Sequence, residues 1–287
     1  MAGSESLREI SLGAEQASGC VALSAEARWN QTSDDWRTML ALGEGFGLVD
    51  PSGRLVATSL ALPYASGGFG WISMVLVTES WRRKGLATRL MESAMASLSS
   101  DGLVAILDAT PAGREVYRLL GFEDTWGIER MQRIEASALP EVRAASIRPM
   151  TDADWGEVLA LDRAAFSADR APLLDDLRRR LPQGALVAEQ GGRINGFLLG
   201  RDGRIATQLG PCVADDEATG VALLAAGFSR VEGPVFLDVP DTHAALGIWL
   251  RNAGFTLQRP YTRMILNRKK PFNKTQRLFA IAGPELG

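Results

Sequence analysis

The sequence predicts an α/β protein of the α+β type, with two similar domains that each hold a mixed, mostly antiparallel sheet flanked by helices. In residues 70–99, an apolar run leads through a cationic, glycine-containing turn directly into an amphipathic helix. Short motifs of the first half recur in the same order in the second half. The chain has 287 residues, of which 46% are hydrophobic, so it can build two ordinary cores.

Composition excludes several classes of partner. The formal net charge is −3, so the basic surface typical of nucleic-acid binders is not expected. No apolar run approaches the length of about 20 residues that spans a bilayer, and residues 1–13 lack the pattern of a signal peptide, so no membrane contact is expected. Cys20 and Cys212 match no metal or disulfide spacing, which favours the reducing cytoplasm.

The first elements in chain order are two helices within residues 20–42. Thr32 or Ser33 is the expected cap of the second helix, with Asp35 completing a capping box. The loop between the helices is polar and aromatic. Its residues Trp29, Asn30 and Gln31 are expected to line a pocket for the substrate, although an ordinary packed loop fits equally well.

Strands and a third and fourth helix follow. Residues 47–57 form a hairpin turned at Pro51-Ser52-Gly53, and a further strand is expected near 58–62. Residues 72–77 and 103–107 are buried strands, and an amphipathic helix runs from Leu86. A last helix has Thr110 as its cap and Pro111 in its first turn, and Gly121 ends it in a left-handed conformation.

The turn between the strand at 72–77 and the helix from Leu86 is the best candidate for a ligand site. Three cations, Arg82 to Lys84, stand just before the point where the first backbone N–H groups of the helix lack intrahelical partners. Gly85 and Ala87 are small enough to let an anion approach the backbone. The turn therefore predicts a phosphate site, whereas a bare cationic turn would more often be solvated.

The alanine-rich stretch 137–146 is the predicted linker, which divides the chain into domains 1–136 and 147–287. In the second domain Asp215, Asp216 and Glu217 stand where the first has its cations, and carboxylates there would repel phosphate. Leu250 stands where the first domain has Tyr117. The second copy is therefore expected to be chemically silent and the chain to have one active site.

Two of these motifs resemble those of the GNAT superfamily of acyl-CoA-dependent N-acetyltransferases. The run from Arg82 to Ala87 is similar to the pyrophosphate loop of that family, with Ala87 in place of the commoner glycine. The run Tyr117 to Phe122 resembles its Y-x-x-x-G-F signature, and Ile147-Arg148-Pro149 resembles the usual start of such a domain. The whole chain resembles a tandem GNAT protein with a degenerate second copy.

The resemblance implies acetyl-CoA as cosubstrate and assigns roles to individual residues. The pantetheine arm would pair with the strand, and the pyrophosphate would bind backbone N–H groups of the loop. The coenzyme-binding residues so assigned are Val75, Leu76, Val77, Arg82, Arg83, Lys84, Gly85, Leu86, Ala87 and Thr88. Tyr117 would be the general acid that protonates the departing thiolate. A buried tyrosine with a structural hydrogen bond is the alternative.

The group that deprotonates the amine is left open. Ser73 is the only polar residue in 72–77, where many relatives carry a carboxylate, and it is assigned with the loop 29–31 to substrate binding. Asp108, at the end of the adjacent strand, is the first candidate for the base. Glu26, the terminal carboxylate of Gly287 and a water molecule are the alternatives.

The predicted activity is direct transfer of the acetyl group from acetyl-CoA to a primary amine, expected to belong to a small molecule. A non-catalytic acyl-CoA sensor or scaffold, or a protein or peptide N-acetyltransferase, are the alternatives. No metal is expected, because His243 is the single histidine of the chain. The acceptor, the acyl-chain preference and homo-oligomer formation are left open by the sequence.

Overall fold

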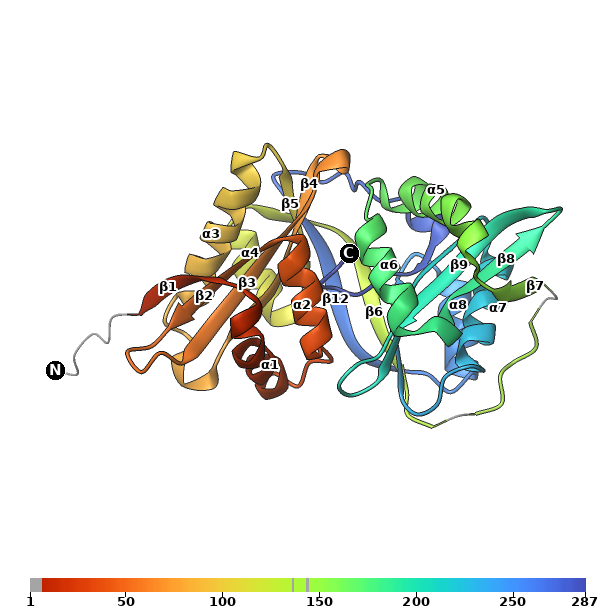
Figure 1. Ribbon diagram of the computed structural model, residues 1–287, viewed down its shortest axis with the longest axis horizontal. Coiled ribbons are helices and arrows are strands. Elements are labelled where there is room, and N and C mark those ends of the chain that lie inside the picture. The colour runs from red at the N-terminus through yellow and green to blue at the C-terminus, as the bar shows by residue number, and fades with distance from the viewer. Residues whose placement is uncertain (1–6, 136, 143–144) are drawn as a thin grey trace. The chain divides into compact units, whose positions relative to one another are not determined.

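The computed structural model describes residues 7–135, 137–142 and 145–287 (Figure 1). Contacts divide the chain into two compact units. The first unit runs to Leu107 and also includes Leu286, and the second comprises residues 108–285 and Gly287. The predicted domains 1–136 and 147–287 follow the sequence repeat rather than these contacts, and they stay a prediction.

The first unit is a twisted sheet with helices on both faces. Its strands are β1 (Arg8–Leu12), β2 (Glu44–Val49), β3 (Leu55–Tyr64), β4 (Phe69–Val77) and β5 (Val104–Ala109), of which the last two residues fall in the second unit. They pair in this order, antiparallel from β1 to β4 and parallel between β4 and β5. The helices are α1 (Ala17–Glu26), α2 (Ser33–Leu42) and α3 (Leu86–Ser100), with single 3-10 turns at η1 (Ala14–Gln16), η2 (Ala65–Gly67) and η3 (Glu79–Trp81).

Successive side chains of β3 point to opposite faces of the sheet, and both faces are covered by helices. Ser59 faces α3, where its hydroxyl donates to the carbonyl oxygen of Leu90 at 3.0 Å. The next residue, Leu60, points to the other face, where it adjoins Leu40 of α2 around Gly45. The predicted separate strand near 58–62 is wrong, because these residues continue β3 without a break.

The second unit contains a larger mixed sheet. Its strands are β6 (Phe122–Arg133), β7 (Ser146–Pro149), β8 (Leu186–Gln190), β9 (Arg193–Arg201), β10 (Thr207–Ala214), β11 (Val235–Pro240), β12 (Thr256–Leu266) and β13 (Leu278–Ala280). Its helices are α4 (Pro111–Leu119), α5 (Trp155–Phe166), α6 (Ala171–Arg180), α7 (Glu217–Phe228) and α8 (Ala244–Asn252), with 3-10 turns at η4 (Asp152–Asp154), η5 (Pro182–Gly184) and η6 (Thr275–Arg277). The strand order is β12-β6-β11-β10-β9-β8-β7, and β13 pairs with β10.

One strand of the first repeat lies inside this second sheet. β6 follows α4 in the first half of the sequence, yet it pairs antiparallel with β11 on one edge and with β12 on the other. If each repeat formed its own sheet, β12, the strand after α8, would pair with β11. Instead β6 pairs with β11 and so takes the place of β12. This exchange explains why residues 108–133 belong to the second unit.

The caps predicted from the sequence are confirmed. The Thr32 hydroxyl accepts from the N–H of Asp35, and Thr110 caps α4 by accepting from the N–H of Gly113. Gly121 has φ of +90°, the left-handed conformation expected after a helix. The predicted linker 137–146 connects β6 to β7, and its residues 143 and 144 lie outside the described residues.

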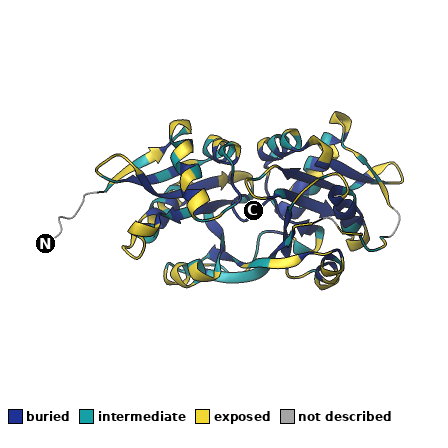
Figure 2. Cartoon of the chain, turned by 90° about the horizontal axis from the view of Figure 1, so that it is seen from below, coloured by how far each residue is buried: buried dark blue, intermediate teal, exposed yellow. Residues whose placement is uncertain are grey.

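Buried residues lie on the strands of each unit and on one side of the helices that pack against them (Figure 2). In the second unit, one apolar cluster joins β10 and β11 to α7 and α8 and also contains Phe279 and Ala280 of β13. Cys20 and Cys212 are free and buried. No helix in the described part of the chain is long and apolar enough to cross a membrane.

Candidate active site

The strand β4 carries a bulge that was not predicted from the sequence. Ser73 pairs with Leu60 and Leu76 pairs with Thr58, so two residues of β4 face the single residue Ser59. The first of these two, Met74, has φ of +52°, and its carbonyl oxygen accepts from the Thr58 hydroxyl at 2.8 Å. A non-glycine residue in this conformation is uncommon, and β-bulges, which end strand pairing or redirect a side chain, are frequent next to active sites.

The bulge coincides with the point where β4 and β5 separate. Parallel pairing of the two strands ends at Trp71 and Ile106. Beyond Trp71, residues 72–77 are paired with β3 on one edge, and no pairing with another described strand occupies the other edge. The assigned residues Val75, Leu76 and Val77 therefore offer a free strand edge to an extended ligand.

The loop from Thr78 to Gly85 leads from β4 into α3 through two left-handed residues. Arg83 has φ of +61° and Gly85 has φ of +76°, and Gly85 is the residue that precedes the first turn of α3. No side chain caps this helix end and no acidic residue lies in its first turn. The N–H groups of Leu86, Ala87 and Thr88 are therefore left for a ligand, as expected for an anion site.

The cations of the loop are exposed, and two of them are oriented by contacts within the first unit. Arg82 Nε donates to the carbonyl oxygen of Val77 at 3.0 Å, and Lys84 Nζ lies 4.3 Å from the centre of the Trp81 ring. The side chains of all three are exposed, so their charges can reach a bound phosphate.

Glu26, one of the candidates for the base, holds the start of the loop. Its carboxylate accepts from the Thr78 hydroxyl at 2.7 Å and from the Glu79 N–H at 2.6 Å. The hydrogen bond from Thr78 lowers the pKa of Glu26, and the nearby Arg82 contributes to this. A carboxylate with a lowered pKa is a weak base, so these contacts favour a positioning role.

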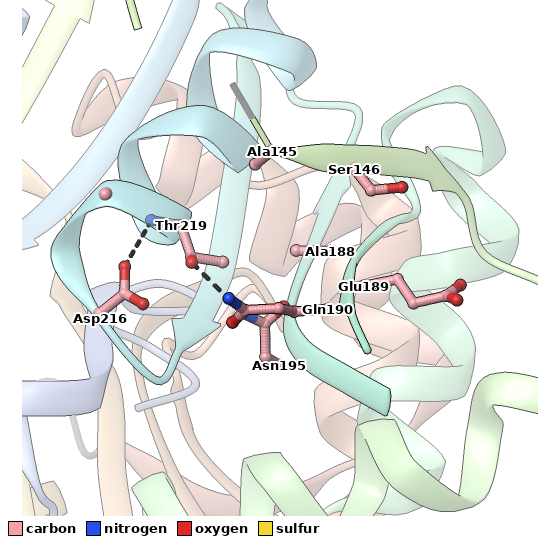
Figure 3. Close-up of a pocket in the computed structure, with 9 residues that line it drawn as sticks. Ala145, Ser146, Ala188, Glu189, Gln190, Asn195, Asp216 and Thr219 are labelled. Carbon is pink, nitrogen blue, oxygen red and sulfur yellow. Dashed lines mark hydrogen bonds between the residues drawn. The ribbon is translucent and has the colours of Figure 1, made fainter. Parts of the chain in front are cut away.

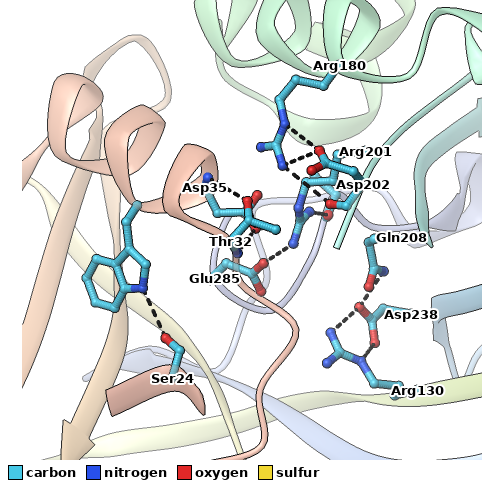
Figure 4. A network of polar contacts seen from close by, with 12 residues as sticks. Ser24, Thr32, Asp35, Arg130, Arg180, Arg201, Asp202, Gln208, Asp238 and Glu285 are labelled. Carbon is cyan, nitrogen blue, oxygen red and sulfur yellow. Dashed lines mark hydrogen bonds and ion pairs between the residues drawn. The ribbon is translucent and has the colours of Figure 1, made fainter. Parts of the chain in front are cut away.

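The predicted substrate-binding residues lie in the first unit. Asn30 and Gln31 are buried in the loop between α1 and α2, Trp29 is half-buried beside them, and Ser73 is buried on β4 next to the bulge. The Oε1 atom of Gln31 and the Oγ atom of Ser73 are buried without a hydrogen-bond partner among the described residues. The loop is braced from α2, where the Trp36 indole donates to the Ser24 hydroxyl at 3.0 Å (Figure 4).

Tyr117 lies on α4, in the second unit. Its ring lies over Gly113, where a Cβ atom would come within 2.8 Å of the ring, and it contacts Phe122 at a centroid distance of 6.3 Å. The two roles predicted for Tyr117, a general acid and a buried tyrosine with a structural hydrogen bond, both stay predictions. Burial raises the pKa of Tyr117 to about 12, so the phenol is protonated at neutral pH and can donate.

Asp108, the first candidate for the base, lies in a buried ion pair of the second unit. Arg263 Nε and Nη2 each donate to one of its carboxylate oxygens at 2.8 Å, and both side chains are wholly buried. Burial raises the pKa of Asp108, and the Arg263 guanidinium opposes this rise. Since both oxygens are engaged by a fixed guanidinium, the contacts favour a structural role for Asp108, and its role as base stays a prediction.

The last candidates for the base are Gly287 and water. The Gly287 carbonyl oxygen accepts from Arg170 Nη1 at 2.7 Å, and the same guanidinium binds both oxygens of Asp162. A role for the terminus as base stays a prediction.

Within the described residues, no three metal-ligating side chains gather as a metal site.

The corresponding turn of the second unit differs in length and charge. Only Asp215 and Asp216 separate β10 from α7, and Asp216 caps that helix by accepting from the Thr219 N–H at 2.8 Å. A pocket of about 210 Å³ lies beside this cap, and Asp216, Thr219 and Asn195 are among the residues that line it (Figure 3). A carboxylate thus already caps this helix end, whereas the start of α3 has no such cap.

Comparison with known proteins identifies related sequences for both halves. The model described as "Acetyltransferase (GNAT) family" matches residues 14–122, and one described as "Acetyltransferase (GNAT) domain" matches residues 158–280. The "Uncharacterized N-acetyltransferase YitH" of Bacillus subtilis is 24% identical over 279 residues, which cover 97% of this chain and 98% of that protein.

Solved structures show the same fold over the whole length. The "Putative Acetyltransferase" from Pyrococcus horikoshii superposes with a TM-score of 0.82 at 17% identity, covering 100% of this chain and 98% of that one. A "Tandem GNAT protein from the clavulanic acid biosynthesis pathway" superposes with a TM-score of 0.64 at 16% identity, covering 93% and 99% of the two chains. At these identities the likeness is one of fold.

Proposed function

Because GNAT models match both halves, the chain belongs to the GNAT superfamily of acetyltransferases as a tandem member, and we propose that it transfers acetyl from acetyl-CoA to a primary amine. The observation that carries the proposal is the uncapped start of α3 beyond the bulge of β4. This family uses acyl-CoA, and the choice of acetyl-CoA and of a small-molecule amine is our proposal.

Coenzyme binding follows from the geometry of the first unit. The free edge of β4 beyond Trp71 would pair with the amide groups of the pantetheine arm as a strand would. The N–H groups at the start of α3 would then meet the pyrophosphate, with Arg83 and Lys84 supplying positive charge. The bulge at Met74 would aim a backbone N–H at the thioester oxygen, where negative charge develops.

In the proposed reaction the neutral amine attacks the thioester carbon, the C–S bond breaks, and the sulfur leaves as a thiolate. Tyr117 donates its proton to the thiolate and is reprotonated from solvent; burial raises the pKa of Tyr117 to about 12, so the phenol carries its proton when the thiolate forms. The amine must also lose one proton. The buried Oγ of Ser73 and Oε1 of Gln31 have no partner among the described residues, and such groups are normally completed by water or a ligand. We assign to them the binding of the amine, or of the water that takes its proton.

A thiol-release assay across a panel of small-molecule amines and peptides tests the proposal. Acetyl-CoA should be consumed only with an acceptor present, and a small-molecule amine should give the higher kcat/KM. Tyr117→Phe should lower kcat by about 10²-fold or more while leaving the Kd for acetyl-CoA unchanged. Tight binding without turnover on any acceptor, together with no effect of Tyr117→Phe, would instead mean an acyl-CoA sensor. A preference for peptides would contradict the small-molecule assignment.

A further inference from the structure

The second unit contains its own cleft between two parallel strands. β10 and β11 pair only from Thr207 to Leu209, and β10 then bulges between Leu209 and Cys212. Here, as between β4 and β5, the strands separate beside a bulge at the carboxyl end of a short parallel pairing. The difference is that this cleft is filled by the chain itself.

β13 occupies the cleft as an added strand. It runs antiparallel to β10, with Ala280 opposite Cys212 and Leu278 opposite Val213. On the other side, the Ile281 N–H donates to the Asp238 carbonyl oxygen of β11 at 2.9 Å. The segment therefore starts near the end of β10 that leads into α7 and runs back along β10 into the core. A pantetheine arm whose phosphate lay at the start of α7 would run in the same direction.

The segment is packed as part of the core. Phe279 lies against the first turn of α7, where a Cβ on Gly220 would come within 2.6 Å of its ring. Further in, the Ile281 carbonyl oxygen lies so close to Gly210 that a Cβ there would be 2.0 Å away. Residues 278–282 are all buried, with at most 1% of their surface exposed. No room is left for a second ligand along this edge of β10.

Polar contacts fix both ends of the segment. His243 Nε2 lies 2.7 Å from the Thr275 carbonyl oxygen and 3.1 Å from that of Leu278, so it is the protonated nitrogen that donates to both. At the inner end, the guanidinium of Arg201 donates to the Ala282 carbonyl oxygen at 2.8 Å and pairs with Glu285 (Figure 4).

The charges of the cleft and of its occupant are complementary, and opposite in sign to those of the first unit. Arg277 Nη2 lies 3.2 Å from an Asp215 carboxylate oxygen at the mouth of the cleft. A pocket of about 360 Å³ remains at this mouth and includes Glu217 and Phe279. In the first unit, exposed cations stand at the corresponding helix start. At the mouth of this cleft the occupant thus contributes a cation, Arg277, and the helix start contributes carboxylates.

We propose that residues 275–285 are a permanent intramolecular occupant of the second cleft, taking the place of a pantetheine arm. Backbone hydrogen bonds substitute for those of a coenzyme, and Arg277 on Asp215 substitutes for phosphate on a cationic loop. The comparison of this cleft with a coenzyme site rests on the proposed function. That residues 275–285 stay in the cleft does not rest on it. The chain should bind one acetyl-CoA, and the occupant should stay in place while it does so.

The register offers a direct test of permanence. Ala280 stands opposite the native Cys212, so Ala280→Cys in a Cys20→Ser background can form a cross-strand disulfide. The same protein, reduced, is the matched control. Oxidised and reduced forms should both bind one acetyl-CoA per chain by calorimetry and should turn over within about 2-fold of each other. Loss of binding or turnover on oxidation, restored by reduction, would overturn the proposal because the segment would then have to leave.

Hydrogen exchange on the unmodified protein gives a second measurement that does not depend on the disulfide. The amides of Leu278 to Ala282 should exchange as slowly as those of β10, and acetyl-CoA should not speed them. Exchange as fast as in an exposed loop, or faster on adding acetyl-CoA, would overturn the proposal. Two coenzymes per chain would do the same. If no acetyl-CoA binds at all, the proposed function fails, while slow exchange would still support the occupant.

Discussion

At the scale of single residues, a chemical role could be predicted where a local motif carries it. The general-acid role of Tyr117 rests on a six-residue signature and stays a prediction, and burial raises the pKa of the phenol to about 12, which keeps it protonated at neutral pH. Asp108 was chosen because it follows a strand, but its partner Arg263 is 155 positions away in the sequence. A buried ion pair of this kind depends on the tertiary fold, so no local pattern could have predicted it.

Tyr117 should act as a general acid over a wide pH range. The protonated form is the active one and burial raises its pKa to about 12, so the phenol is fully protonated well above neutral pH. We expect kcat to show no alkaline decline from Tyr117 between pH 7 and 10, as measured against the profile of Tyr117→Phe. An alkaline limb with an apparent pKa below 10 that disappears in the phenylalanine variant would contradict this.

Asp108→Asn should act on stability rather than on chemistry. The substitution leaves the buried Arg263 guanidinium without its counter-charge, and breaking such a pair costs about 3–5 kcal/mol. Denaturant unfolding should show this loss, and kcat per folded molecule should stay within about 3-fold of wild type. If unfolding is unchanged and kcat falls by orders of magnitude, Asp108 is the base after all.

At the scale of elements, strand, turn and helix could be predicted from apolar periodicity and caps, which are local. The bulge of β4 could not, because it depends on the register with β3 rather than on the residues of β4 alone. The tether from Glu26 to Thr78 and Glu79 was also missed, since it joins α1 to a turn more than 50 residues later. Two of the features that shape the site thus arise only from pairing between elements.

Gly85→Glu should abolish acetyl-CoA binding by placing a carboxylate at the start of α3. Gly102→Glu, at the other end of α3, is the matched control. Both glycines have left-handed φ, +76° and +70°, and neither has an atom within 4 Å of an added Cβ, so both variants bear a similar backbone strain of about 1–2 kcal/mol. Calorimetry should show binding lost only in Gly85→Glu. Equal binding by both variants would mean that the coenzyme lies elsewhere.

Glu26→Gln distinguishes a positioning residue from a base. The amide keeps an acceptor for Thr78 but loses the charge-assisted bond from the Glu79 N–H, so the loop should loosen. We expect the KM for acetyl-CoA to rise by about 10-fold with kcat nearly unchanged. Glu9→Gln is the control, since Glu9 binds Arg89 and Ser93 of α3 rather than the loop. A fall in kcat at constant KM would assign the base to Glu26.

At the scale of the whole molecule, the repeat could be predicted from recurring motifs, but not the exchange of β6. Sequence similarity shows which residues correspond, whereas the choice of partner strand is decided by pairing between distant segments. The division of contacts near residue 107, rather than at the alanine-rich stretch, follows from this exchange.

Cleavage after β6 should therefore not separate the two pieces. A protease site inserted between Leu139 and Pro140 would leave β6 on the first piece and both of its neighbours, β11 and β12, on the second. After cutting, the pieces should co-elute on size exclusion and separate only in denaturant. Separation under native conditions would contradict the pairing of β6.

The position of β6 also has a consequence during synthesis on the ribosome. β6 ends at Arg133 and β12 ends at Leu266, so 133 residues must be made before both edges of β6 can be paired. At about 5–20 residues per second, a strand with unsatisfied edges waits roughly 7–27 s in the nascent chain. Translation speed and chaperone supply, rather than final stability, should then govern how much of this protein reaches its native state.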